Sequence, residues 1–100
     1  MEKILLNKVA IITGANRGLG FEIAKKYVSC GAKVVLFARD KDLLDSCKNE
    51  LDELFGFNSN IIVISGDVSN EKDVKNLIDE TLSKFGRYDI IVNNAGIYGP

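Results

Sequence analysis

The stretch TGANRGLG, residues 13–20, joins a short apolar run to a segment with helical spacing. The run at residues 9–12 is too short for a helix and predicts a strand that is buried on both faces. The side chains with helical spacing that follow are Leu19, Ile23, Ala24, Tyr27 and Val28. We therefore expect a strand that turns through a glycine loop into a helix. Such a loop suits an anionic group, because the N–H groups and dipole of the first helical turn favour a phosphate and glycines let the backbone approach it.

The same alternation continues along the rest of the chain. Apolar runs predict further strands at residues 33–37, 61–64 and 88–92, and a helix is predicted before each of the last two. The order βαβαβαβ with short connections is typical of a parallel sheet covered by helices on both faces. We expect an α/β fold, a Rossmann-like doubly wound parallel sheet with strand order 3-2-1-4, formed by one domain over residues 1–100.

Capping residues and periodicity predict where the helices end and which faces they bury. Gly31, Gly56 and Gly86 are expected at the three C-terminal ends. Asp40 and Ser69 are expected to cap the N-termini of the second and third helices. The predicted inner face of the second helix comprises Leu43, Leu44, Cys47, Leu51, Leu54 and Phe55. That of the third comprises Val74, Leu77, Ile78, Leu82 and Phe85.

Composition narrows the class of protein. Thirteen basic and fourteen acidic residues give a formal charge of −1, which provides no electrostatic surface for nucleic acid or an anionic membrane. Cys30 and Cys47 form no C-x-x-C pair and are interpreted as reduced packing residues of a cytoplasmic protein. No signal peptide or apolar span is recognised. The lack of histidine and of a cysteine cluster predicts no metal site and no Ser-His-Asp catalysis.

Two further motifs follow predicted strands. Asp67 and Val68 come after the third strand, and NNAG, residues 93–96, comes directly after the fourth. Together with TGANRGLG, whose glycine spacing differs from the common G-x-G-x-x-G, they resemble the three cofactor motifs of the short-chain dehydrogenase/reductase family. The resemblance covers essentially the whole chain and indicates a member similar to 3-oxoacyl-acyl-carrier-protein reductases or general ketone reductases.

The resemblance implies a dinucleotide site at the carboxyl ends of the strands, where open α/β sheets bind ligands. The glycine loop would line the pyrophosphate and nicotinamide side, and Gly20 would allow close helix packing. Asp67 would accept a hydrogen bond from the adenine amino group, and the Val68 N–H would reach a ring nitrogen. The loop residues are Gly14, Asn16, Arg17, Gly18 and Leu19, and those implied beside the adenosine ribose are Asn94, Ala95 and Gly96.

The end of the second strand bears on the choice of cofactor. An NAD-dependent enzyme usually has Asp or Glu at the last strand position, which bonds to the ribose 2′-hydroxyl and repels a 2′-phosphate. That position is Ala38, and the next is Arg39, whose guanidinium can pair with a 2′-phosphate with help from Arg17. We therefore expect a preference for NADP(H). NAD(H) stays possible, because Asp40 or Asp42 could reach the ribose if the strand ended later.

Each of these residues also has a purely structural explanation. The glycines could serve merely to form a tight turn between the strand and the helix. Arg39 could be a solvated surface residue, and Asp67 could cap the following turn. The amides of Asn93 and Asn94 could satisfy the sheet edge without meeting a ligand, which is the interpretation we favour for Asn93.

The resemblance further implies a catalytic tyrosine, a lysine four residues later that lowers its pKa, a serine and a helix asparagine. No Tyr-x-x-x-Lys occurs, because the positions four after Tyr27 and Tyr88 hold Gly31 and Val92, and Tyr98 is near the end. The family's catalytic elements follow NNAG. We therefore predict that this chain supplies the cofactor-binding half of an oxidoreductase without its catalytic residues. The parent, expected to be a homo-oligomer, would transfer hydride between NADP(H) and a small carbonyl or alcohol substrate.

Two other functions stay open, a non-catalytic dinucleotide-binding module and an inert truncated product. The coding sequence after Pro100 distinguishes them, because a continuing frame with Ser and Tyr-x-x-x-Lys indicates an enzyme. The sheet edge at residues 88–92 is expected to be exposed, so we predict that the isolated chain is poorly stable or aggregation-prone.

Overall fold

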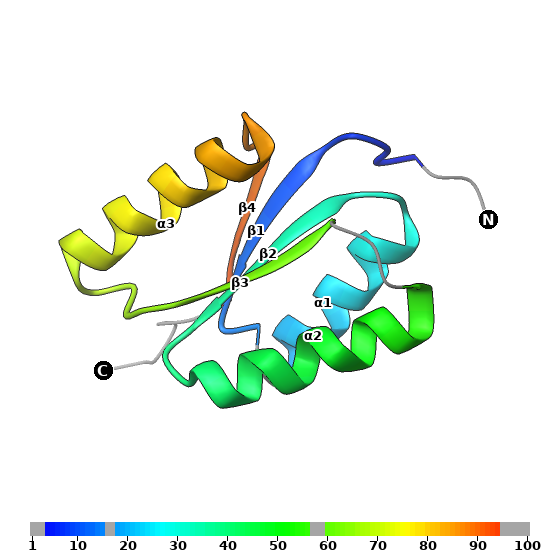
Figure 1. The fold of residues 1–100 in the computed structure, drawn as a ribbon, viewed down its shortest axis with the longest axis horizontal. Helices are drawn as coiled ribbons and strands as arrows, with labels where there is room; N and C mark the ends of the chain where they lie inside the picture. The colour runs from blue at the N-terminus through cyan, green and yellow to red at the C-terminus, as the bar shows by residue number, and fades with distance from the viewer. Residues whose placement is uncertain (1–3, 16–17, 57–59, 95–100) are drawn as a thin grey trace.

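The computed structural model describes residues 4–15, 18–56 and 60–94 (Figure 1). Within these residues four strands alternate with three helices. The strands are β1 (Val9–Thr13), β2 (Lys33–Ala38), β3 (Ile61–Ser65) and β4 (Ile90–Asn93), and the helices are α1 (Gly18–Ser29), α2 (Lys41–Phe55) and α3 (Glu71–Phe85).

The strands form one sheet in the order β3-β2-β1-β4. Every neighbouring pair is parallel, with Ile11 opposite Val35 in β2 and opposite Ile91 in β4. Helices α1 and α2 cover one face and α3 covers the other (Figure 1). The predicted doubly wound parallel sheet with order 3-2-1-4 is confirmed, and the carboxyl ends of all four strands share one edge.

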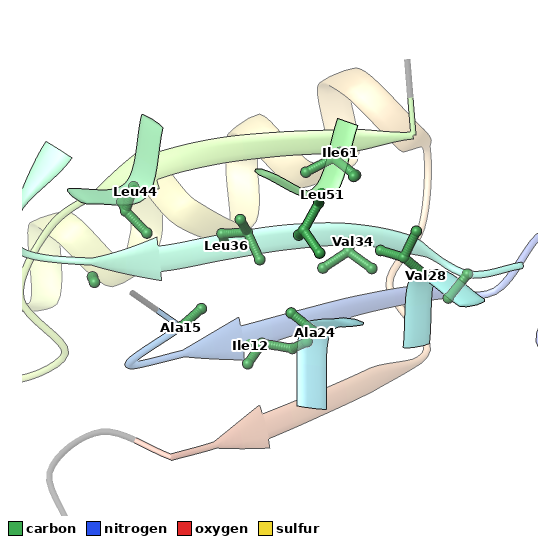
Figure 2. Close-up of a cluster of buried hydrophobic side chains, with 11 residues drawn as sticks. Ile12, Ala15, Ala24, Val28, Val34, Leu36, Leu44, Leu51 and Ile61 are labelled. Atoms are coloured by element: carbon green, nitrogen blue, oxygen red, sulfur yellow. The ribbon is translucent and has the colours of Figure 1, made fainter. Parts of the chain in front are cut away.

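The period of two along the strands divides the core into two clusters. The α1–α2 cluster, shown in Figure 2, contains alternate strand residues packed under two helices. Its buried members are Ile12, Ala15, Ala24, Val28, Ala32, Val34, Leu36, Ala38, Leu44, Leu51 and Ile61. The α3 cluster on the opposite face is smaller. Its buried members are Ile11, Val35, Phe37, Ile64 and Leu77.

Helix ends follow the capping expectations at every position but one. The Asp40 side chain accepts from the Leu43 N–H, and Gly86 ends α3 in the left-handed conformation with φ of 79°. The predicted Ser69 cap of α3 is wrong. Asn70 is the cap, and its side-chain oxygen accepts from the N–H groups of Lys72 and Asp73. Ser69 lies one residue too early and donates to Asp67 instead.

The inner faces of α2 and α3 are narrower than the periodicity predicts. In α2, Leu44 and Leu51 are fully buried, whereas Leu54 is 55% exposed and Leu43 and Phe55 are also exposed. In α3, Leu77 is buried, whereas Val74 and Leu82 are exposed. A helix that lies on a sheet buries only one stripe, and the predicted sets extended beyond that stripe. Thr81 of α3 is fully buried and was not predicted, and its hydroxyl donates to the Leu77 carbonyl.

Strand β4 begins two residues later than predicted, at Ile90. Asp89 forms the entry to the strand, because its N–H donates to the Val9 carbonyl and its carboxylate accepts from the Val9 N–H. Arg87 pairs with the same carboxylate at 2.6 Å. These contacts lower the pKa of Asp89, with the Arg87 hydrogen bond as the largest cause and the Val9 N–H next.

Candidate functional site

The candidate site lies at the edge where the strands end. Short turns leave this edge after β1, β2 and β3, and Asn94 follows β4. Because all strands are parallel, these four segments lie at the same edge of the sheet. Among the predicted site residues, Asn16, Arg17, Ala95 and Gly96 lie outside the described residues.

The turn between β1 and α1 is tied to the neighbouring strand. The Gly14 N–H donates to the Phe37 carbonyl at 2.8 Å, and Gly14 has a φ of 64° that favours glycine. Helix α1 then begins at Gly18, and Leu19 in its first turn is exposed. The first turn of α1 contains no acidic side chain, unlike the first turns of α2 and α3. This helix N-terminus therefore offers its N–H groups without a competing carboxylate.

Gly20 lies where α1 presses against the glycine loop. A Cβ at this position would be 2.2 Å from the Gly14 carbonyl oxygen and 2.8 Å from Asn94 Nδ2. No side chain fits between these atoms. The absence of a Cβ therefore permits the close packing that joins α1, the loop and the end of β4.

The Thr13 hydroxyl links the ends of β1 and β4. As a donor, the hydroxyl lies 3.2 Å from Asn93 Oδ1 and 3.4 Å from the Val92 carbonyl oxygen. As an acceptor, it receives the Asn94 N–H at 2.9 Å. Asn94 Nδ2 donates to the Gly14 carbonyl at 3.4 Å. Both asparagines thus make hydrogen bonds at the sheet edge, as in the structural explanation that the sequence analysis left open for them. Thr13 itself was missed as a separate residue, although a hydroxyl at the end of an apolar strand was the available signal.

Strand β2 ends one residue beyond the predicted apolar run at residues 33–37, at the position that the cofactor argument took as its last residue. The strand ends at Ala38, and Arg39 follows with its side chain 80% exposed. The Asp40 carboxylate is engaged as the cap of α2, and Asp42 is exposed in the first turn of that helix. Arg39 is therefore the first side chain beyond the strand.

The end of β3 is shaped by Gly66. Its N–H donates to the Ala38 carbonyl at 2.9 Å, and a Cβ there would be 2.9 Å from two atoms of the buried Phe37 ring. Gly66 was also missed by sequence reasoning, and its position between a β-branched strand and Asp67 was the only signal. Val68 is partly buried and packs against the α3 cluster.

Asp67 is held by its neighbours. Its N–H donates to the Asp73 carboxylate at 2.9 Å, and its Oδ1 accepts from the N–H and the hydroxyl of Ser69, each at 2.8 Å. Hydrogen bonds from the Ser69 backbone and then its side chain lower the pKa of Asp67, and the nearby Arg39 charge adds to this. Asp67 thus caps the following turn, as the structural explanation expected, and its Oδ2 lies 3.9 Å from Arg39 Nη1.

Metal ligands, membrane-spanning helices and reactive thiols would indicate other kinds of site. Among residues 4–15, 18–56 and 60–94, no three His, Cys, Asp or Glu side chains lie close enough to hold a metal ion. None of the helices described has the length and apolar character needed to cross a membrane. Cys30 and Cys47 are both free, and burial raises the pKa of the Cys47 thiol.

Comparison with known proteins finds one family. The sequence model of the family described as short chain dehydrogenase matches residues 8–100. The 11-beta-hydroxysteroid dehydrogenase-like 2 protein of Arabidopsis thaliana is 44% identical over 90 residues, which make up 90% of this chain and 29% of that relative. The chain thus spans less than a third of this relative's length.

Solved structures give the same picture. L-Sorbose reductase from Gluconobacter frateurii, complexed with NADPH and L-sorbose, superimposes with a TM-score of 0.89 at 36% identity, covering 99% of this chain and 37% of that one. The 3-ketoacyl-(acyl-carrier-protein) reductase from Brucella melitensis, complexed with NADH, gives a TM-score of 0.83 at 42% identity, covering 93% and 36%.

Proposed function

The chain belongs to the short chain dehydrogenase family, and on that premise we propose that it binds a nicotinamide dinucleotide, with NADP(H) preferred, at the carboxyl edge of its sheet. The observation that carries the proposal is the turn from β1 into α1, whose glycines bring the backbone to a helix N-terminus without acidic side chains. Among the residues described, no atom lies within 4 Å of a Cβ added at Gly18, which is consistent with a ligand approaching the start of α1.

Each part of the dinucleotide has residues that would hold it. The pyrophosphate and nicotinamide side would lie against Gly14, Asn16, Arg17, Gly18 and Leu19, with Gly20 keeping α1 close to the loop. Asp67 and Val68 would hold the adenine. The adenosine ribose would lie beside Asn94, Ala95 and Gly96. These assignments follow the family's motifs, and the carboxyl-edge location of the described members supports them.

The preference for NADP(H) rests on the end of β2. Arg39 is exposed directly after the strand, where a guanidinium can form a charge-assisted pair with a 2′-phosphate. Ala38 offers no carboxylate to a ribose hydroxyl, and Asp40 is engaged as a helix cap. The solved relatives are complexed with NADPH in one case and NADH in the other, so the preference depends on these residues of this chain.

The reaction proposed for the whole protein is hydride transfer between NADP(H) and a small carbonyl or alcohol compound. The bound nicotinamide would supply the hydride chemistry, and this chain would bind and orient it. No Tyr-x-x-x-Lys occurs in the 100 residues, so we expect no turnover by this chain alone. The two free cysteines fit a reducing compartment such as the cytoplasm, and the family resemblance favours a homo-oligomer.

The test is a titration of the purified protein with NADPH and, separately, with NADH, followed by nucleotide fluorescence. We expect tighter binding of NADPH, and Arg39→Ala should weaken NADPH binding about tenfold through loss of a charge-assisted pair while leaving NADH binding nearly unchanged. Lys75→Ala is the matched control, because Lys75 is an equally exposed cation on α3. A folded wild-type protein that binds neither nucleotide would refute the proposal.

A further inference from the structure

The Arg39–Asp67 ion pair joins the ends of two adjacent strands. The register between β2 and β3 brings the two residues together, because Ala38 lies opposite Ser65. The Gly66 N–H then donates a further hydrogen bond to the Ala38 carbonyl. Arg39 and Asp67 therefore leave the sheet side by side. Their side chains meet with Arg39 Nη1 3.9 Å from Asp67 Oδ2.

Asp67 is the fixed member of this pair. Ser69 donates two hydrogen bonds to Oδ1, and Asp73 accepts the Asp67 N–H, so both the carboxylate and the backbone are oriented. The oxygen left over is Oδ2, which faces the guanidinium. Its position is thus set by the turn between β3 and α3.

Arg39 is the movable member. Its side chain is 80% exposed, against 39% for Asp67, and the structure shows no other ion pair for it among the residues described. A long, exposed side chain with one partner at 3.9 Å can change partners at small cost in free energy. A stronger anion near the end of β2 would therefore attract the guanidinium away from Asp67.

On the basis of the proposed function above, we propose that Asp67 is a specificity-determining residue that competes with the 2′-phosphate of NADP(H) for the Arg39 guanidinium. In the cofactor-free protein Arg39 pairs with Asp67 Oδ2, and NADP(H) binds by drawing it to the phosphate. NAD(H) has no 2′-phosphate and leaves the pair intact. A carboxylate oxygen has two lone pairs, so Oδ2 can accept from the adenine amino group in either case. Asp67 therefore reduces the preference for NADP(H) without affecting how adenine is read.

The experiment is a double-mutant cycle on Asp67→Asn and Arg39→Ala, measured as dissociation constants for NADPH and NADH at about 0.15 M salt, where screening confines charge effects to about 8 Å. Asn keeps the size of Asp67 and its acceptor for Ser69 but removes the charge. We expect Asp67→Asn to raise the NADPH-to-NADH affinity ratio about two- to fivefold, the range of an exposed ion pair. In the Arg39→Ala background the same change should leave the ratio unaltered.

Glu53→Gln is the control for general charge, because Glu53 is exposed on α2, is no candidate for the cofactor site, and forms no ion pair in the described part of the chain. It should leave the ratio unchanged. An equal rise in Glu53→Gln, or a rise in Asp67→Asn that persists without Arg39, overturns the inference and leaves the proposed function standing. A wild-type protein that binds neither nucleotide overturns both.

A second measurement needs no substitution at Asp67. The carboxyl carbon resonance of Asp67 should shift more on addition of adenosine 2′-monophosphate than of adenosine 5′-monophosphate, because only the former draws Arg39 away. The difference should vanish in Arg39→Ala. Equal shifts with the two nucleotides in the wild-type protein contradict the competition.

Discussion

The two halves of the strand-end edge are built differently. At the ends of β1 and β4, Thr13, Asn94 and the glycine loop are joined by hydrogen bonds and by a contact at Gly20 that no side chain could occupy. At the ends of β2 and β3, Arg39 is exposed, Asp67 is partly buried, and one ion pair of 3.9 Å joins their side chains.

The difference matches what each half would have to do. A backbone that cradles a pyrophosphate must be held in one conformation, because its N–H groups have to converge on one anion. In our proposal, Arg39 changes partner when a 2′-phosphate is present, which an exposed side chain with one long ion pair can do at small cost. Substitutions in the first half should therefore affect folding, and those in the second should affect preference.

The largest effect is expected at Gly20. Replacement with Ala places a Cβ against the Gly14 carbonyl, and backbone on both sides must move, at a cost of about 3 kcal/mol in the free energy of unfolding. Gly86→Ala is the control, since it also changes a glycine, but its Cβ would meet no atom of the described residues within 4 Å. It should cost only about 1 kcal/mol of left-handed strain. Chemical denaturation of both variants tests this, and similar losses would contradict the steric explanation.

The next effect concerns the Thr13 hydroxyl. Thr13→Val keeps the shape but leaves the Asn94 N–H and the Asn93 side chain without this partner, which should cost about 2 kcal/mol. Thr13→Ser keeps the hydroxyl and loses one methyl, about 0.8 kcal/mol. Hydrogen exchange of the Asn94 amide separates the two, because it should accelerate in the Val variant alone.

In the other half, the largest loss of stability should come from a helix cap. Asn70→Ala removes the oxygen that accepts from Lys72 and Asp73, with an expected cost of about 1 kcal/mol. Ser69→Ala should cost less than about 0.5 kcal/mol, as for an exposed position outside the cap. The reverse order in thermal melts would return the cap to Ser69.

Arg39 should matter least to the fold. Arg39→Ala removes an exposed side chain with one long ion pair, so the free energy of unfolding should change by less than about 0.5 kcal/mol. A larger loss in a denaturation curve would show that the pair stabilises the sheet edge, and it would weaken the contrast between the two halves.

The smallest expected effect is the contribution of Asp67 to the pH dependence of stability. The Ser69 hydrogen bonds lower the pKa of Asp67 in the folded protein relative to the unfolded chain. The ionised carboxylate therefore stabilises the fold at pH values above the pKa of the unfolded chain. This stabilisation is lost as the pH falls through the lower pKa of the folded protein. Asp67→Asn should reduce this loss slightly, because an amide does not titrate in this range. Melting temperatures compared at neutral and acid pH test the difference.

Local patterns in the sequence predicted most of the fold. Apolar runs and capping glycines predicted the alternation of strands and helices, because such patterns depend on a few adjacent residues. The order of the strands in the sheet followed from the Rossmann-like pattern, and the apolar run placed the end of β2 one residue early, at residue 37. The widths of the helix faces were overestimated, since periodicity does not show how much of a helix the sheet covers. Ser69 and Asn70 are adjacent residues that can both cap, and only the turn geometry selects between them.

The site was predicted less completely, because its contacts connect distant residues. The Thr13 hydroxyl accepts a hydrogen bond from the Asn94 N–H, 81 residues later in the sequence, and no local sequence pattern predicts such a contact. Arg39 and Asp67 were each singled out, but their pairing depends on the register between β2 and β3. Asn16, Arg17, Ala95 and Gly96 remain predictions from the motifs.

The members of the α1–α2 cluster also differ from β4 in when they are synthesised on the ribosome. Every buried member of that cluster lies at or before Ile61, so these residues are all synthesised before α3 and β4, and Val92 of β4 later packs against them. The sheet order places the newest strand beside the oldest, with β4 joining β1. Synthesis from the N-terminus therefore supplies the buried residues of the α1–α2 cluster first, and β4 can pair with β1 only after α3 has been made.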